Sequence, residues 1–175
     1  MKRFTCWIVT VCCCIFLFAC ASKRDRAEKL YDEIAEAWEK SNYSLCLEKT
    51  NKAIEIDDSY AVLYYVRGNI YAIGNTDYAA AIPEYTKSIE LGYTDKLAYH
   101  GRGISYMMLE DFNNAITDFT TVIEIDPEYA AAYYTLAKSY AGLSDENNML
   151  INLQKAAQLG HNKSQELLKK EGYSW

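Results

Sequence analysis

Few side chains in this 175-residue chain have the types and spacings that catalysis needs. The two histidines, His100 and His161, have no serine, cysteine or carboxylate at a spacing that would build a nucleophile and its base. Adjacent carboxylates such as Asp57 and Asp58 fall where a helix is expected to end, and solvation and capping account for them there. No metal-ligand spacing or phosphate-binding loop occurs in the sequence. The sequence therefore predicts no enzyme activity, no cofactor and no metal site.

Tyrosines are the abundant side chains with binding chemistry, and the chain has 16 of them. In the window 96–129, aromatic and small residues fall at helical spacing with a break after Leu109. These columns are Tyr99, Gly103, Tyr106, Leu109, Phe112, Ala115, Phe119, Val122 and Pro127. Such spacing predicts two helices joined by a turn.

The same columns return in three further windows at a period of 34 or 35 residues. Their members are Tyr64, Gly68, Tyr71, Tyr78, Ala81, Tyr85 and Ser88 in 61–95; Tyr133, Ala137, Tyr140, Leu143, Met149, Leu153 and Ala156 in 130–163; and Leu30, Ile34, Ala37, Tyr43, Cys46, Thr50 and Ala53 in 27–60. The extra residue of window 61–95 is predicted to lie in the turn at 74–77. Repetition of this kind predicts a stacked array.

The columns resemble the tetratricopeptide repeat, a helix-turn-helix unit of about 34 residues. Windows 61–95 and 96–129 match it closely, whereas Ile34 in the first unit and Met149 in the last replace its usual small residues. The resemblance implies an all-α, right-handed α-solenoid of about four units plus a C-terminal capping helix. The chain then divides into a signal peptide 1–19, a lipid-anchored tether 20–26, units 27–60 (divergent), 61–95, 96–129 and 130–163, and a capping helix and tail 164–175.

Small residues mark where the two helices of a unit are expected to touch. Gly68, Gly103 and Ala137 share one such column, because a bulky side chain there would hold the helices apart. Cys46 stands in a helix-packing column where the family usually has alanine. We expect it to be a small buried hydrophobic residue rather than a reactive thiol.

Helix ends are marked towards the C-terminus as well. Asp126 before Pro127 predicts a helix N-cap followed by a first-turn proline. The segment 164–170 predicts a short helix with Leu167 and Leu168 on its apolar side, which would cover the last face of the array.

The N-terminus carries a secretory pattern in which Lys2 and Arg3 precede a charge-free run over 4–19. The tetrad Leu17-Phe18-Ala19-Cys20 resembles a bacterial lipobox, which implies cleavage before Cys20 and a lipid on its thiol. A transmembrane anchor and ordinary cleaved secretion are the alternatives. The lipobox implies a lipid-anchored protein of the bacterial cell envelope, with the outer membrane favoured over the inner and the periplasmic face over the cell surface.

The charge of the predicted mature chain bears on its partners. Removal of 1–19 leaves 16 basic residues against 24 acidic ones, a net charge of −8. A strongly acidic chain repels the phosphate backbone, so nucleic acid is not expected as a partner.

The family implies a binding surface, because tetratricopeptide arrays line their concave side with the first helix of each unit. By column, the predicted partner-binding residues are Tyr31, Trp38, Tyr65, Asn69, His100, Ile104, Met107, Tyr134 and Lys138. Tyr31, Tyr65, His100 and Tyr134 share one column and form an aromatic ladder. The alternative is that these rings fold back onto the neighbouring repeat and fill space.

The positions of charged residues bear on which ligands the family resemblance allows. A clamp for the C-terminal carboxylate of a chaperone requires Lys and Asn in the first unit, where Tyr31 and Ala35 stand instead. That clamp is therefore not expected. Arg67 and Arg102 are predicted to pair with acidic side chains of the preceding helix rather than to contact a ligand.

The sequence thus predicts a non-enzymatic, membrane-anchored adaptor or scaffold. Its partner would be a protein that binds as an extended peptide or a helix, since flat aromatic rings bury much area at little entropic cost. The alternative is an envelope recognition module for a small ligand such as a peptide or glycan fragment.

Overall fold

The computed structural model describes residues 23–175, and this part of the chain is entirely helical apart from its turns. The predicted signal peptide and the predicted lipidation site Cys20 lie outside the described residues. Among the described residues, a first helix covers 23–39 and forms an antiparallel pair with the second helix; the helices after it form three more such pairs and one single C-terminal helix. The helices that follow the first one are α2 (Tyr43–Ile56), α3 (Ala61–Asn69), η1 (Ile70–Gly74), α4 (Tyr78–Glu90), α5 (Lys96–Met108), α6 (Phe112–Ile125), α7 (Ala130–Gly142), α8 (Glu146–Gln158) and α9 (Asn162–Lys170).

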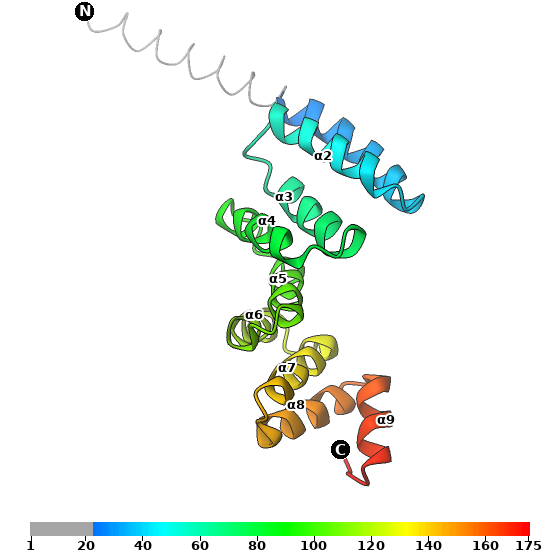
Figure 1. Ribbon diagram of the computed structural model, residues 1–175, viewed down its shortest axis with the longest axis vertical. Coiled ribbons are helices and arrows are strands. Elements are labelled where there is room, and N and C mark those ends of the chain that lie inside the picture. The colour runs from blue at the N-terminus through cyan, green and yellow to red at the C-terminus, as the bar shows by residue number, and fades with distance from the viewer. Residues whose placement is uncertain (1–22) are drawn as a thin grey trace, which may run out of the picture.

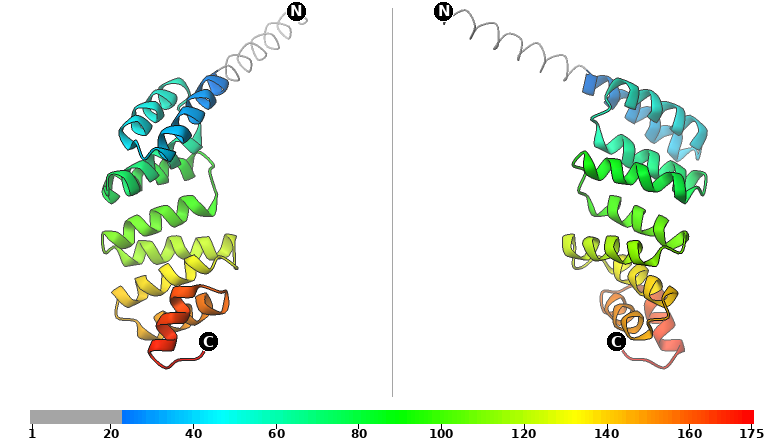
Figure 2. Two further views of the ribbon diagram at one scale, coloured as in Figure 1. Left: turned by 90° about the vertical axis from the view of Figure 1, so that its right-hand side faces the viewer. Right: turned by 60° about the vertical axis from the view of Figure 1, so that its left-hand side comes forward.

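The helical pairs stack along the long axis of the molecule, from the first helix at one end to α9 at the other (Figure 1). The two further views show the helices as successive rungs (Figure 2). The all-α solenoid predicted from the periodicity is confirmed. Helices α3, α5 and α7 begin at Ala61, Lys96 and Ala130, the first residues of the predicted second, third and fourth units.

The turn inside each unit has one repeated design. A residue with positive φ stands at the same column of all four units, as Ser41, Thr76, Glu110 and Ser144. The residue that follows caps the second helix by accepting a hydrogen bond from the amide three residues on. These caps are Asn42, Asp77, Asp111 and Asp145. A short polar side chain in this position satisfies an amide that the helix leaves free.

The extra residue of the second unit lies earlier than predicted. The end of α3 widens into the π-helical turn η1, where the amide of Asn75 donates to the carbonyl oxygen of Ile70 at 3.1 Å. The insertion is therefore absorbed within the helix rather than in the turn at 74–77, and the Thr76–Asp77 turn keeps the form of the other units. A π-turn takes up one residue without breaking the hydrogen-bonded ladder.

Glycines allow the helices of the second and third units to pack closely, as predicted. A Cβ atom added at Gly103 would lie 2.8 Å from Cε1 of Phe119, and one at Gly68 would lie 2.8 Å from Cε1 of Tyr85. Both rings are almost fully buried. The large ring on the second helix therefore occupies the space that the glycine leaves on the first.

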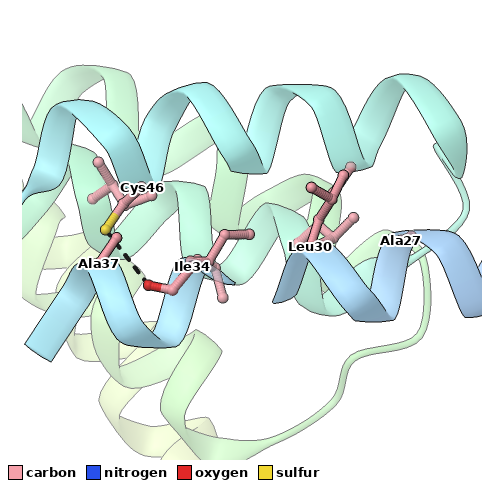
Figure 3. Close-up of a cluster of buried hydrophobic side chains, with 9 residues drawn as sticks. Ala27, Leu30, Ile34, Ala37 and Cys46 are labelled. Carbon is pink, nitrogen blue, oxygen red and sulfur yellow. Dashed lines mark hydrogen bonds between the residues drawn. The ribbon is translucent and has the colours of Figure 1, made fainter. Parts of the chain in front are cut away.

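The core of the divergent first unit is apolar and closed. Ala27, Leu30, Ile34 and Ala37 of the first helix pack with Cys46 of α2 (Figure 3). The Cys46 thiol donates to the carbonyl oxygen of Ile34 at 3.7 Å, and burial raises the pKa of this thiol. The prediction of a small buried residue at this position is confirmed.

Part of the predicted tether proves to be structured. Residues 23–26 belong to the first helix, and residues 20–22 lie outside the described residues. Arg24 fixes this end of the helix to the rest of the first unit. Its Nε atom lies 2.6 Å from Oδ2 of Asp57, and its guanidinium lies over the ring of Tyr60. Within the described residues, no helix has the length and apolarity needed to cross a bilayer.

Two helix ends near the C-terminus differ from prediction. Asp126 closes α6 instead of opening the next helix, since α7 begins at Ala130 after Tyr129. In α9, Leu168 is buried but Leu167 is 38 % exposed, so the two leucines do not share the covered face. Adjacent helical residues point about 100° apart, which leaves only Leu168 in line with the buried Ser164.

Candidate functional site

Two adjoining clefts run between the first helices of the first three units. The first cleft, of about 310 Å³, is lined by Tyr31, Ile34, Ala35, Trp38, Glu39, Tyr65, Val66 and Asn69. The second cleft, of about 450 Å³, is lined by Tyr65, Asn69, Ala72, Ile73, Thr76, Tyr78, Tyr85, Leu97, His100, Gly101 and Ile104. Tyr65 and Asn69 line both clefts, which together we call the groove.

Most of the predicted binding residues lie in this groove. Tyr31, Trp38, Tyr65 and Asn69 meet in the first cleft. His100 and Ile104 join Tyr65 and Asn69 in the second. These six residues come from three successive units, so the repeat columns bring them together as expected.

Met107, Tyr134 and Lys138 line neither cleft. Met107 packs on the cluster around Phe119, and Tyr134 stacks on His161 with ring centroids 4.5 Å apart. Lys138 is exposed on α7. The groove is therefore concentrated in the first three units, and the fourth unit uses its aromatic residue for packing.

The aromatic ladder has a structural role as well as a surface role. The Tyr65 ring lies 5.2 Å from that of Tyr93, and the His100 ring lies 5.4 Å from that of Tyr129. Each partner ring, like His161 beside Tyr134, stands in the turn that leads to the next unit. Three ladder rings therefore pack on a ring from the last turn of their own unit rather than on the neighbouring repeat, whereas Tyr31 stays 38 % exposed.

Sequence reasoning missed this second row of rings. Its members are Tyr93, Tyr129 and His161, which lie in the turns after the second helices of the second, third and fourth units. A ring after the second helix of each of these units is a signal in the sequence for such a partner of the ladder. The row holds the ladder rings in place, so the walls of the groove are preorganised.

Burial sets the protonation of the groove histidine. The His100 ring lies between Phe119 and Tyr129, and burial lowers its pKa to about 4. Its Nε2 atom is buried without a hydrogen-bond partner among the described residues. The imidazole is therefore neutral at pH 7 and contributes no charge to the groove.

Asn69 is the central polar group of the groove. Its Oδ1 accepts a hydrogen bond of 2.8 Å from the hydroxyl of Tyr85, and burial raises the pKa of that tyrosine. Because the carbonyl oxygen is engaged, the amide nitrogen is the part of Asn69 that can donate to a ligand. The arrangement suits a ligand that offers a carbonyl oxygen.

The two arginines in the seventh column hold helices together, but their partners differ from prediction. Arg67 pairs with Glu84 at 2.8 Å, and Arg102 pairs with Asp118 at 2.7 Å. Both carboxylates belong to the following helix. The preceding helix supplies the neutral acceptors Asn51 and Thr86.

The geometry of stacking explains this difference. The first helix of a unit packs between its own second helix and the second helix of the preceding unit, so the arginine reaches both. Its charge is matched by the carboxylate within the unit, while the neutral oxygen ties the unit to its neighbour. Both side chains are thus held by the array rather than left for a ligand.

The described residues hold no group of three or more His, Cys, Asp or Glu side chains that could bind a metal ion. The groove itself is lined by aromatic, aliphatic and amide groups, with Glu39 as its one carboxylate. Such a surface binds by contact area and a few hydrogen bonds.

Comparisons with known proteins agree with this architecture. Models of the tetratricopeptide repeat match residues 61–91 and 97–129. No curated protein matches the sequence. Among solved structures, MamA from Desulfovibrio magneticus RS-1 superimposes with a TM-score of 0.75 at 18 % identity, covering 83 % of this chain and 93 % of that one.

Two further solved structures were described with peptide-binding sites or peptides. YrrB, a TPR protein with an unusual peptide-binding site, has a TM-score of 0.73 and 23 % identity, over 83 % of this chain and 74 % of its own. The first TPR of Spaghetti (RPAP3), bound to an HSP90 peptide, has a TM-score of 0.66 and 22 % identity, over 69 % of this chain and 94 % of its own. At these identities the likeness concerns the fold. The chain contains tetratricopeptide repeats at 61–91 and 97–129, and its described residues stack as four helix-turn-helix units.

Proposed function

We propose that this protein is a non-enzymatic adaptor that binds a partner protein through an extended peptide in the groove. One observation carries the proposal: two apolar clefts adjoin along successive first helices and share Tyr65 and Asn69. Similar arrays described with a peptide-binding site or a bound peptide support it as an analogy.

The size and order of the clefts favour an extended segment. Side chains two residues apart in an extended peptide lie on the same side, separated by about 7 Å. Two such side chains can enter the first and second clefts, while the Asn69 amide nitrogen donates to a carbonyl oxygen between them. Of the rings that line the groove, those of Trp38, Tyr65 and His100 are already fixed by neighbouring rings, so binding orders few side chains.

The groove is unsuited to anchoring a terminal carboxylate. No lysine or arginine lines either cleft, and the one ionisable nitrogen base, His100, is neutral. Recognition therefore depends on side chains of the partner and on its backbone rather than on its C-terminal charge.

We further propose that the adaptor is held at the bacterial cell envelope by a lipid on Cys20. This part rests on the pattern Leu17-Phe18-Ala19-Cys20 and on the charge-free run before it. The outer membrane and its periplasmic face are the proposed location. Because the folded array begins by residue 23, the groove would lie close to the membrane surface.

The test is affinity capture from native envelopes with the full chain as bait. The groove variant Tyr31→Ala/Ile73→Ala removes one exposed side chain from each cleft, and neither residue belongs to the closed core. The control variant Ile125→Ala/Ile151→Ala removes two exposed side chains from second helices, outside the groove.

The proposal expects a defined protein that is captured by the wild-type chain and by the control, and lost with the groove variant. A partner that is lost with the control but kept by the groove variant would place binding on another face. A folded bait that captures no protein, but whose melting temperature rises with envelope metabolites, would favour a small-ligand module instead.

A further inference from the structure

The first cleft combines aromatic rings with a carboxylate. Tyr31 and Trp38 of the first helix face it from one side, and Tyr65 of α3 faces it from the other. Glu39, exposed on the first helix, is the only charged residue among those that line it, all of which lie in the described part of the chain. We propose that the first cleft binds a cationic side chain, lysine or arginine, of the partner peptide. This inference rests on the proposed function and specifies the chemistry of its partner.

The three rings are presented in a way that suits a cation. Residues 31 and 38 are two helical turns apart and so share one face of the first helix. The Trp38 ring is fixed by an edge-to-face contact with Tyr43 at 5.4 Å, and the Tyr65 ring is fixed by Tyr93 and Tyr85. These three supporting rings do not line the first cleft. Trp38 and Tyr65 are thus held by contacts made outside the cleft, and Tyr31 adds an exposed ring to it.

The chemistry of the lining matches a long basic side chain along its whole length. Ile34, Ala35 and Val66 offer apolar surface for a methylene stem. Aromatic faces carry negative electrostatic potential, which attracts an ammonium or guanidinium group placed over them. The Glu39 carboxylate complements the same charge.

The part of the first helix that lines the cleft is acidic, as is Glu39 itself. From Leu30 to Glu39 the first helix carries four acidic residues and no basic one, and Lys29 and Lys40 flank this stretch. Of these, Glu33 is paired with Lys49 at 2.5 Å, whereas Glu39 is at the cleft. An acidic peptide side chain would meet the Glu39 carboxylate with no lysine or arginine among the residues that line the cleft, so the cleft discriminates against acidic partners.

The test measures binding of a matched peptide series to the full chain in detergent, by isothermal titration at physiological salt. The series is acetyl-Ala-Leu-Ala-X-Ala-Leu-Ala-amide, with lysine, arginine, norleucine or glutamate at X. Norleucine keeps the methylene stem of lysine without its charge. We expect the lysine and arginine peptides to bind about tenfold more tightly than the norleucine peptide, and the glutamate peptide to bind most weakly.

Single substitutions distinguish binding of a cation in the cleft from general attraction of basic peptides to an acidic protein. Glu39→Gln should reduce the preference for lysine over norleucine about three- to fivefold, whereas Glu36→Gln removes the same charge one turn away, outside the cleft, and should leave it unchanged. Tyr31→Leu should also reduce the preference, and its exposed position keeps the fold intact. Equal effects of Glu39→Gln and Glu36→Gln would overturn the proposal.

The remaining outcomes distinguish this proposal from the proposed function. If all four peptides bind equally, the groove binds peptides but the cation site is refuted. If tetramethylammonium chloride binds and no peptide does, the ligand is a small cation, and both the side-chain assignment and the peptide adaptor are refuted. If none of these probes binds, the cation site is refuted, and the capture experiment decides the proposed function separately.

Discussion

Replacing Gly103 tests how closely the two helices of the third unit approach each other. A Cβ atom at this position would lie 2.8 Å from Cε1, 3.0 Å from Cδ1 and 3.1 Å from Cζ of Phe119. The Phe119 ring is fully buried and packs with Ala115 and Leu136, so it has little space into which to move. The added methyl group therefore forces the two helices apart.

Two opposing effects set the change in the free energy of unfolding when Gly103 is replaced. Alanine in place of glycine within a helix ordinarily stabilises by about 1 kcal/mol. Overpacking a closed core by a methyl group costs about 1–3 kcal/mol. We expect Gly103→Ala to lower the free energy of unfolding by about 1 kcal/mol net, and Gly103→Leu, with three more carbons, to lower it by several kcal/mol.

Urea denaturation followed by circular dichroism measures these changes. Phe119→Leu provides the control, since it vacates part of the space that a Cβ atom would enter. In the Phe119→Leu background, Gly103→Ala should lose its penalty and stabilise the protein. If Gly103→Ala alone stabilises the wild-type chain by about 1 kcal/mol, helix propensity dominates and the close approach argued here is incorrect.

Two further predictions concern buried charge and pH. Asp118→Asn leaves the Arg102 guanidinium without its carboxylate, although the Arg102 side chain is only 18 % exposed. The substitution should lower the free energy of unfolding, measured by urea denaturation, by about 2–3 kcal/mol. A change below about 0.5 kcal/mol would show that the ion pair adds nothing to stability. Burial lowers the pKa of His100 to about 4, below its ordinary value of about 6.5, so the unfolded chain binds the proton more tightly. The neutral His100 side chain should therefore contribute about 3 kcal/mol to the free energy of unfolding above pH 6.5, and this contribution should disappear as the pH falls towards 4. Thermal unfolding of wild type and His100→Phe across this range measures it, and parallel pH profiles would disprove the assignment.

The repeat columns predicted the fold because they record a packing constraint. A glycine at one column and a large ring at another are complementary in the second and third units, as Gly103 and Phe119 are, so the pattern is visible in sequence. The same columns placed Tyr31, Trp38, Tyr65 and Asn69 in one cleft. Local chemistry set the turns equally well, through a capping Asn or Asp in each unit.

The repeat columns did not predict which of two possible neighbours a side chain contacts. Arg102 lies within reach of two helices, and its column does not say which of them carries the carboxylate. Tyr134 could face the groove or stack on His161, and that depends on the turn before α9, which breaks the repeat. The π-turn at Ile70–Gly74 was likewise hidden, because an inserted residue can enter a helix or a loop with the same sequence length.

The most direct test of the adaptor is site-specific photo-crosslinking in native envelopes. A benzophenone amino acid replaces Tyr31 in the first cleft, Ile73 in the second, or Ile151 on α8, and all three positions are exposed. The account predicts one partner protein crosslinked from both cleft positions and absent from Ile151. Crosslinks from Ile151 alone, or none from either cleft in cells that contain the folded protein, would contradict it.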